Sequence, residues 1–121
     1  MSPKTKVAIS FLQANLQRVI TVAEIARSAD LSDSCLFYLF KTDLGVSPIK
    51  YLKRLRTERA RELLETSLKS VEVIAAEVGY NDCTHFMRDF KKAYGSRPSQ
   101  FRAAYLTSAA VKVTMEESRI G

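Results

Sequence analysis

The chain has 121 residues, of which 46% are hydrophobic, and it contains four glycines, three prolines and two cysteines. This composition allows one folded domain or two small lobes on a shared helix, and it excludes a low-complexity chain and a disulfide framework. The formal net charge of +6 predicts a polyanionic partner, either a nucleic acid or an anionic membrane surface.

The first two predicted elements are helices. Apolar residues recur with helical spacing across residues 4–20, which predicts an amphipathic helix. Thr21 with Glu24 three residues later forms a capping box, so a second helix is expected over residues 22–29. Asp30, a residue type that tolerates a left-handed backbone, then marks a turn.

Two further helices are predicted before the middle of the chain. Ser32 or Asp33 caps a helix over residues 33–42, and Gly45 follows it as a helix-ending glycine. Ser47 then precedes a proline, a combination typical of a helix start, and the helical pattern continues without interruption over residues 48–65.

The second half of the chain repeats the first. Residues 70–101 match residues 21–51, with matching positions 49 apart at first and 50 apart from Leu36 onward. The matching pairs include Ile25 with Ile74, Asp30 with Gly79, Phe40 with Phe90, Gly45 with Gly95 and Pro48 with Pro98. Phe40 and Phe90 are therefore expected to lie in two equivalent small cores.

The repeat determines the predicted fold class. It indicates helices over residues 71–78, 82–94 and 98–106, and no segment alternates as a strand would. We expect an all-α fold of about seven helices, with two helix-turn-helix lobes joined by a long connecting helix. The predicted domain covers residues 1–106, with a first lobe over 7–47, the connecting helix over 48–65 and a second lobe over 66–106. Residues 107–121 are expected to form a frayed helix or a disordered tail.

Tandem helix-turn-helix units point to DNA. The second helix of such a unit can enter a major groove, and here those helices are residues 33–42 and 82–94. The predicted connecting helix over residues 48–65 has 18 residues and is about 27 Å long, close to the roughly 34 Å of one DNA turn. One chain could therefore read two successive major grooves, a site near 20 base pairs, without dimerisation.

A family resemblance agrees with this interpretation. The segment IAAEVGYNDCTHFMRDFKKAYGSRPSQFR, preceded by EIARSADLSDSCLFYLFKTDLGVSPIKYLKRLRTERARELL, resembles the DNA-binding domain of the AraC/XylS family of bacterial transcription regulators over about residues 7–105. The resemblance implies sequence-specific binding to double-stranded DNA and transcription activation through contact with RNA polymerase. The residues themselves show no glycine-rich phosphate loop, no complete nucleophile–base set and no metal cluster, so no enzymatic activity and no cofactor are predicted.

The resemblance also implies which side chains read bases. In the second copy these are Asp82, Cys83, Thr84, Met87 and Arg88, and Arg88 is the strongest candidate because a guanidinium can bond both O6 and N7 of guanine.

The corresponding base-contacting residues of the first copy are Ser34, Phe37 and Tyr38. Family members often have arginine at the position of Tyr38 and a small polar residue at that of Phe37. Aromatic rings cannot make a bidentate guanine contact, so the first unit is expected to read A·T-rich sequence or DNA shape. Packing of both rings against a helix or the other lobe is the alternative.

Phosphate contacts are expected from basic residues near the reading helices and on the connecting helix. The predicted contacts are Lys41, Lys91, Lys92 and Arg97, together with Lys50, Lys53 and Arg54, which form one stripe with Thr57 and Arg61. Local ion pairs with Glu58 and Glu62 are the alternative for this stripe.

The remaining chemistry-bearing residues suggest no second site. Cys83 and His85 supply two metal ligands where a structural zinc site needs four, so no metal is predicted and His85 is expected to cap a helix or touch a phosphate. Cys35 is expected to be half-buried. A non-specific basic or protein-interaction module, and an enzyme with a reactive Cys83 thiol, are the rival interpretations.

The expected location is the cytoplasm, in association with the nucleoid. The first residues lack the order of a signal peptide, and no apolar run approaches the roughly 20 residues of a membrane span. The chain is expected to act as a monomer, or as a dimer only through a domain that is missing here. A stand-alone regulator and the DNA-binding piece of a longer protein both remain open.

Overall fold

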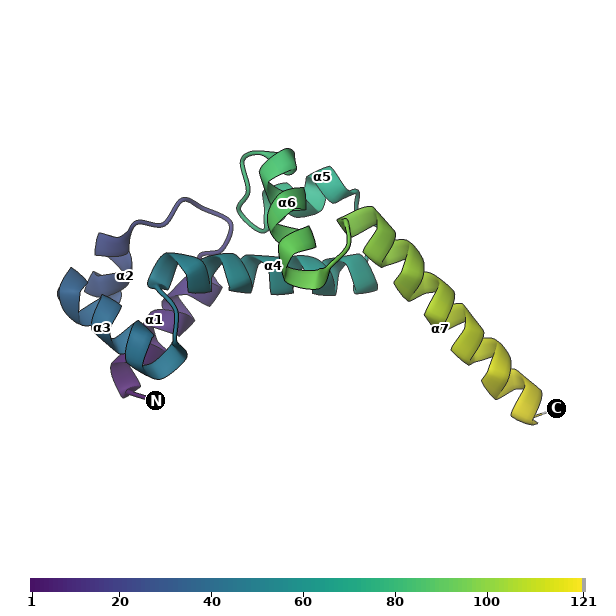
Figure 1. Ribbon diagram of the computed structural model, residues 1–121, viewed down its shortest axis with the longest axis horizontal. Helices are drawn as coiled ribbons and strands as arrows, with labels where there is room; N and C mark the ends of the chain where they lie inside the picture. Colours follow the sequence, from purple (N-terminus) through teal and green to yellow (C-terminus); the bar gives the residue numbers. More distant parts are fainter. Residues whose placement is uncertain (121) are drawn as a thin grey trace.

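The computed structural model describes the backbone of residues 1–120 and the side chains of residues 1–110. Over that part of the chain it contains seven α-helices and no strand, which confirms the predicted all-α class (Figure 1). The helices are α1 (Pro3–Ala14), α2 (Val22–Ser28), α3 (Asp33–Leu44), α4 (Pro48–Thr66), α5 (Val71–Glu77), α6 (Cys83–Tyr94) and α7 (Pro98–Ile120). None of these described helices has both the length and the apolar character that crossing a membrane requires.

Helix α4 belongs to both lobes. It lies along the middle of the molecule, with α1, α2 and α3 around its beginning and α5, α6 and α7 around its end (Figure 1). Leu52 and Leu55 of α4 lie in the first core, whereas Ala60, Leu63 and Leu64 lie in the second. The connecting helix is therefore the last helix of one lobe and the first helix of the next.

Five of the helices begin at the side-chain caps that the sequence predicts. The hydroxyl oxygens of Thr21, Ser32, Ser47 and Ser70 each accept a hydrogen bond from the backbone N–H three residues later. The Asp82 carboxylate accepts one from the Thr84 N–H. These bonds satisfy donors that a helix start leaves free, so the caps fix where α2 to α6 begin.

The two cores are equivalent in position and different in composition. Phe40 and Phe90 are both fully buried, as the repeat predicts. Phe40 contacts Tyr51 edge-on, with the ring centroids 5.9 Å apart, whereas Phe90 lies 4.8 Å from Tyr94 and 5.5 Å from Phe101. The second core is the more aromatic of the two.

Helix α1 ends six residues earlier than predicted. The Asn15 side-chain amide donates to the Phe11 carbonyl at 2.8 Å, and the Asn15 backbone N–H donates to the Leu12 carbonyl instead. An asparagine side chain that takes the i−4 carbonyl competes with the helix ladder. The chain therefore leaves the helix at Ala14, although the apolar pattern continues to Ile20.

The last helix is longer than predicted. We expected it to end near residue 106, with a tail beyond, but α7 continues to Ile120. No glycine or proline interrupts the sequence between Pro98 and Gly121, and four alanines lie between residues 103 and 110. Alanine is the strongest helix former, so the weak apolar pattern there did not prevent a helix.

Replacing Phe90 with alanine should lower the free energy of unfolding by about 3–5 kcal/mol, because the change removes a fully buried ring and leaves a cavity. Chemical denaturation followed by circular dichroism measures the loss. Phe37→Ala is the matched control, since Phe37 is 41% exposed and should cost far less. Equal stability of the Phe90→Ala variant and the wild type would contradict the assigned core.

Candidate nucleic-acid interface

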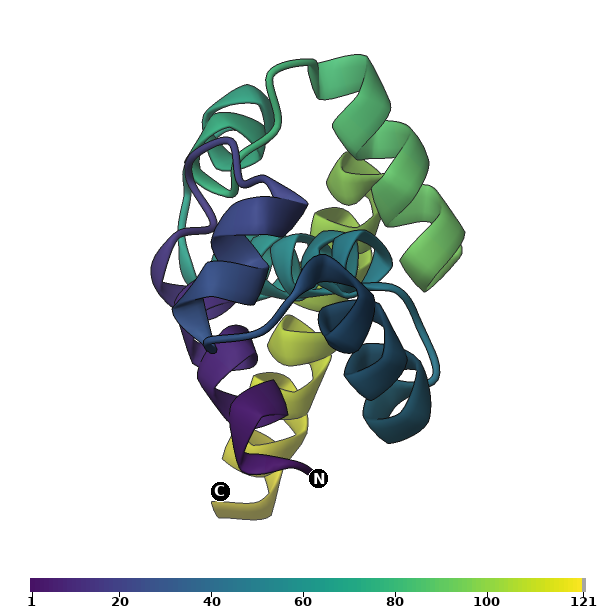
Figure 2. The ribbon, with the colours of Figure 1, turned by 90° about the vertical axis from the view of Figure 1, so that its left-hand side faces the viewer.

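The second helices of the two helix-turn-helix units, α3 and α6, are called the reading helices, and they project from the same side of α4. Figure 2 shows α3 and α6 on one side of the molecule, with α2 and α5 on the other. Two buried residues hold each reading helix against its lobe: Leu36 and Phe40 in α3, and Phe86 and Phe90 in α6. The opposite faces of both helices are left open to a shared partner.

The predicted base-contacting residues of the second lobe divide into two groups. Asp82, Thr84 and Arg88 are exposed, while Cys83 and Met87 are partly buried and pack against the second core. The split follows from helical spacing, since positions 83 and 87 share the side of α6 that carries Phe86 and Phe90. Arg88 forms no ion pair with any side chain that the structure describes.

The two cysteines have exchanged their expected environments. Cys35, predicted to be half-buried, is exposed, and Cys83 is the partly buried one. Burial raises the pKa of the Cys83 thiol, and the nearby carboxylates of Glu72 and Asp82 raise this pKa further. A nucleophilic thiol needs a lowered pKa, so this environment does not favour the reactive-thiol alternative.

The first lobe presents aromatic rings where the second presents arginine. On α3, Ser34 is exposed, and Phe37 and Tyr38 are 41% and 69% exposed. Neither ring belongs to the first core, so both present surface that a partner could contact. Lys41 is exposed in the last turn of the same helix.

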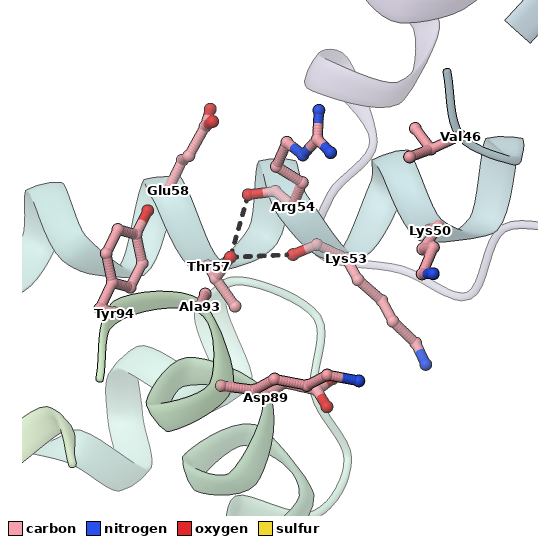
Figure 3. A pocket seen from close by; sticks show the side chains of 10 residues that line it. Val46, Lys50, Lys53, Arg54, Thr57, Glu58, Asp89, Ala93 and Tyr94 are labelled. Atoms are coloured by element: carbon pink, nitrogen blue, oxygen red, sulfur yellow. Dashed lines mark hydrogen bonds between the residues drawn. The ribbon is translucent and has the colours of Figure 1, made fainter. Parts of the chain in front are cut away.

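A groove between α4 and α6 gathers positive charge. Its volume is about 550 Å³, and Figure 3 shows Lys50 and Lys53 extending from α4 on the side where α6 lies. The residues that line it are Val46, Lys50, Lys53, Arg54, Thr57, Glu58, Asp89, Lys92, Ala93 and Tyr94. Lys53 and Arg54 are exposed, and neither pairs with a carboxylate among the described side chains.

Two members of the predicted basic stripe contact other parts of the protein. Thr57 is only 3% exposed, and its hydroxyl donates to the carbonyls of Lys53 and Arg54 (Figure 3). The Arg61 guanidinium lies over the Tyr94 ring and 4.0 Å from Glu65. The members of the stripe that remain free to contact an outside partner are therefore Lys50, Lys53 and Arg54.

Glu62 pairs with Arg59, outside the stripe, at 2.9 Å. Arg61 is the one member of the stripe with a carboxylate partner among the described side chains, Glu65 at 4.0 Å. The remaining predicted phosphate contacts, Lys91, Lys92 and Arg97, are all exposed.

A polar cluster at the start of α6 was not predicted. The Tyr80 hydroxyl donates to an Asp89 carboxylate oxygen at 2.9 Å, and the His85 Nε2 lies 3.7 Å from the same oxygen. Burial and the Asp89 carboxylate raise the pKa of Tyr80 well above its usual range. His85 thus contacts the cluster from within α6, and the N-cap of that helix is Asp82. The Tyr80–Asp89 hydrogen bond therefore links the turn before α6 to the middle of α6.

No metal site accompanies these residues. In the part of the chain with described side chains, no three histidine, cysteine or acidic residues gather as a metal ion would require. Cys83 and His85 thus have no further ligands beside them.

Comparison with known proteins agrees with this architecture. A family model described as a helix-turn-helix domain matches residues 25–104. The chain is 42% identical over 95 residues to the raffinose operon transcriptional regulatory protein RafR of Pediococcus pentosaceus, a match that covers 78% of this chain and 34% of RafR. The chain thus spans about a third of the length of the curated relatives it matches.

Two solved structures are similar over nearly their whole length. The crystal structure of an AraC-type transcriptional regulator from Chromobacterium violaceum has a TM-score of 0.82 at 33% identity, covering 85% of this chain and 92% of that one. The DNA-binding domain of AdpA, solved in complex with a target DNA, also has a TM-score of 0.82, at 27% identity and with coverage of 88% and 96%. The chain belongs to the AraC-type helix-turn-helix family.

Proposed function

We propose that this chain is a sequence-specific transcription regulator that binds double-stranded DNA with α3 and α6 in two successive major grooves. The observation that carries it is the projection of both reading helices from one side of a single connecting helix (Figure 2). The similar AdpA domain was solved with a target DNA, and RafR is named as an operon regulator.

The length of α4 fits this arrangement. Its 19 residues span about 28 Å at 1.5 Å per residue. Successive major grooves on one face of a duplex lie roughly 34 Å apart. Two lobes mounted toward the two ends of such a helix suit that interval, so one chain suffices for one site.

The two lobes divide the readout. Arg88 is exposed and free to bond a guanine edge, whereas Phe37 and Tyr38 offer rings that fit thymine methyl groups and sugars. The second lobe then supplies most of the hydrogen-bonded specificity. The full proposed set of base contacts is Ser34, Phe37, Tyr38, Asp82, Cys83, Thr84, Met87 and Arg88, with Cys83 and Met87 limited to whatever surface their packing leaves exposed.

The groove between α4 and α6 would face the DNA backbone between the two major grooves. Lys50, Lys53 and Arg54 line it from α4 and Lys92 lines it from α6. Exposed cations at this place would neutralise phosphates without reading sequence. Lys41, Lys91 and Arg97 would contact phosphates on either side of this backbone segment.

Four further properties are part of the proposal. The chain would act in the cytoplasm, at the nucleoid, as one monomer per DNA site or as a dimer through a domain outside this chain. Its output would be activation through contact with RNA polymerase. DNA binding by this chain needs no cofactor.

Selection of bound duplexes from a random library of about 30 base pairs, near 150 mM salt, tests the proposed function. We expect an enriched motif of two boxes about one helical turn apart, with the second box more sharply defined because Arg88 reads it. Salt-sensitive binding without any enriched motif would favour the non-specific alternative and overturn the proposal.

Two single substitutions separate base reading from phosphate contact. Arg88→Ala should cost about 1–3 kcal/mol of binding free energy and relax specificity at one base pair. Lys92→Ala should weaken binding to all sequences alike and reduce the salt slope by about one. Fluorescence anisotropy on a set of single-base variants of the selected site measures both effects. A uniform loss with Arg88→Ala would contradict its assignment as a base reader.

A further inference from the structure

The two lobes touch each other on the side of α4 away from the reading helices. The contact joins Gly79, in the turn between α5 and α6, to the carbonyl of Leu16, in the segment between α1 and α2. A Cβ on Gly79 would overlap that carbonyl oxygen and would lie 2.8 Å from the Arg56 Nε. Backbone of the second lobe thus lies directly against backbone of the first.

Arg56 holds the first lobe's side of this contact. Its guanidinium donates from Nε to the Leu16 carbonyl at 3.2 Å and from a terminal nitrogen to the Arg18 carbonyl at 2.9 Å. Both carbonyls lie beyond the end of α1 at Ala14, so helix bonds do not occupy them. Arg56 comes from the middle of α4, between the residues that serve the two cores.

The internal repeat supplies a comparison for Gly79. Asp30 occupies the matching turn of the first lobe, with a φ of 55°, and its side chain is exposed to solvent. Gly79 has a φ of 98° and has the other lobe against it. The turn of the first lobe therefore accepts a side chain at its φ of 55°, whereas the second copy has a glycine, at a φ that strains any side chain, where the first lobe comes close.

The contact continues as a shallow seam. A groove of about 270 Å³ beside it is lined from the first lobe by Gln13, Ala14, Leu16 and Gln17, from α4 by Arg59 and Leu63, and from the second lobe by Glu77 and Val78. All three parts of the molecule meet along this line.

We propose that Arg56 and Gly79 are positioning residues that fix the angle between the two lobes, and that they thereby set the spacing of the two DNA boxes the chain accepts. This role rests on the proposed function. The two cores are separate clusters, so without the seam only one turn of α4 would join the lobes. A fixed angle favours one box spacing, because the second lobe is then already oriented for its box and loses little conformational entropy when it binds.

The test measures affinity against box spacing. Duplexes carry the two selected boxes at the native spacing or with one to five base pairs inserted, and others carry each box alone. Wild type should bind the native two-box duplex on the order of 100-fold more tightly than a single box. It should lose most of that advantage when two base pairs are inserted.

Arg56→Ala should keep its affinity for each single box and flatten the spacing profile, with the two-box advantage reduced roughly tenfold. A merely destabilised lobe would lower single-box affinity instead. Arg102→Ala is the matched control, because Arg102 donates to the Leu64 and Ser67 carbonyls inside the second lobe and does not touch the first. It should lower the melting temperature while leaving the native spacing preferred.

Gly79→Ala is the second variant, and it should displace the lobes and shift or flatten the profile in the same way. If Arg56→Ala melts below the assay temperature, Arg56→Lys takes its place, since one ammonium group can hold only one of the two carbonyls. A spacing profile of Arg56→Ala and Gly79→Ala as sharp as that of the wild type would overturn this role. A wild type that gains nothing from the second box would instead overturn the proposed function.

Discussion

One helix serves two hydrophobic cores, and the rest of the structure depends on that sharing. Leu52 and Leu55 pack into the first core, and Leu63 and Leu64 pack into the second. Each residue of an α-helix adds 1.5 Å of length and 100° of rotation. The number of residues in α4 therefore sets how far apart α3 and α6 lie and the rotation between them about the α4 axis.

The two lobes share a backbone plan and differ in how polar groups hold them. In the first lobe the Asp43 carboxylate accepts hydrogen bonds from the Thr5 hydroxyl at 2.6 Å and the Ser2 N–H at 2.9 Å, which ties α1 to α3. These bonds lower the pKa of Asp43. In the second lobe Tyr80 and Asp89 tie the turn to α6. Each lobe thus holds its reading helix in place with a different set of side-chain hydrogen bonds.

Much of the fold could be predicted from the sequence because its signals are local. Hydroxyl and carboxylate caps, helix-ending glycines and apolar spacing act within a few residues, and they located all seven helices. The repeat then identified Phe40 and Phe90 as core residues and located the two reading helices. The errors lie where a local competitor decided the outcome, as with the Asn15 amide at the end of α1.

The sequence by itself determined the all-α class, the tandem lobes and the exposed position of Arg88, since periodicity along a helix fixes which face is buried. Tertiary structure alone decided the rest, because it brings together residues far apart in the chain. Only the fold turns Thr57 inward and joins Tyr80 to Asp89. It also sets Gly79 against the Leu16 carbonyl, a contact across 63 residues that no local pattern encodes.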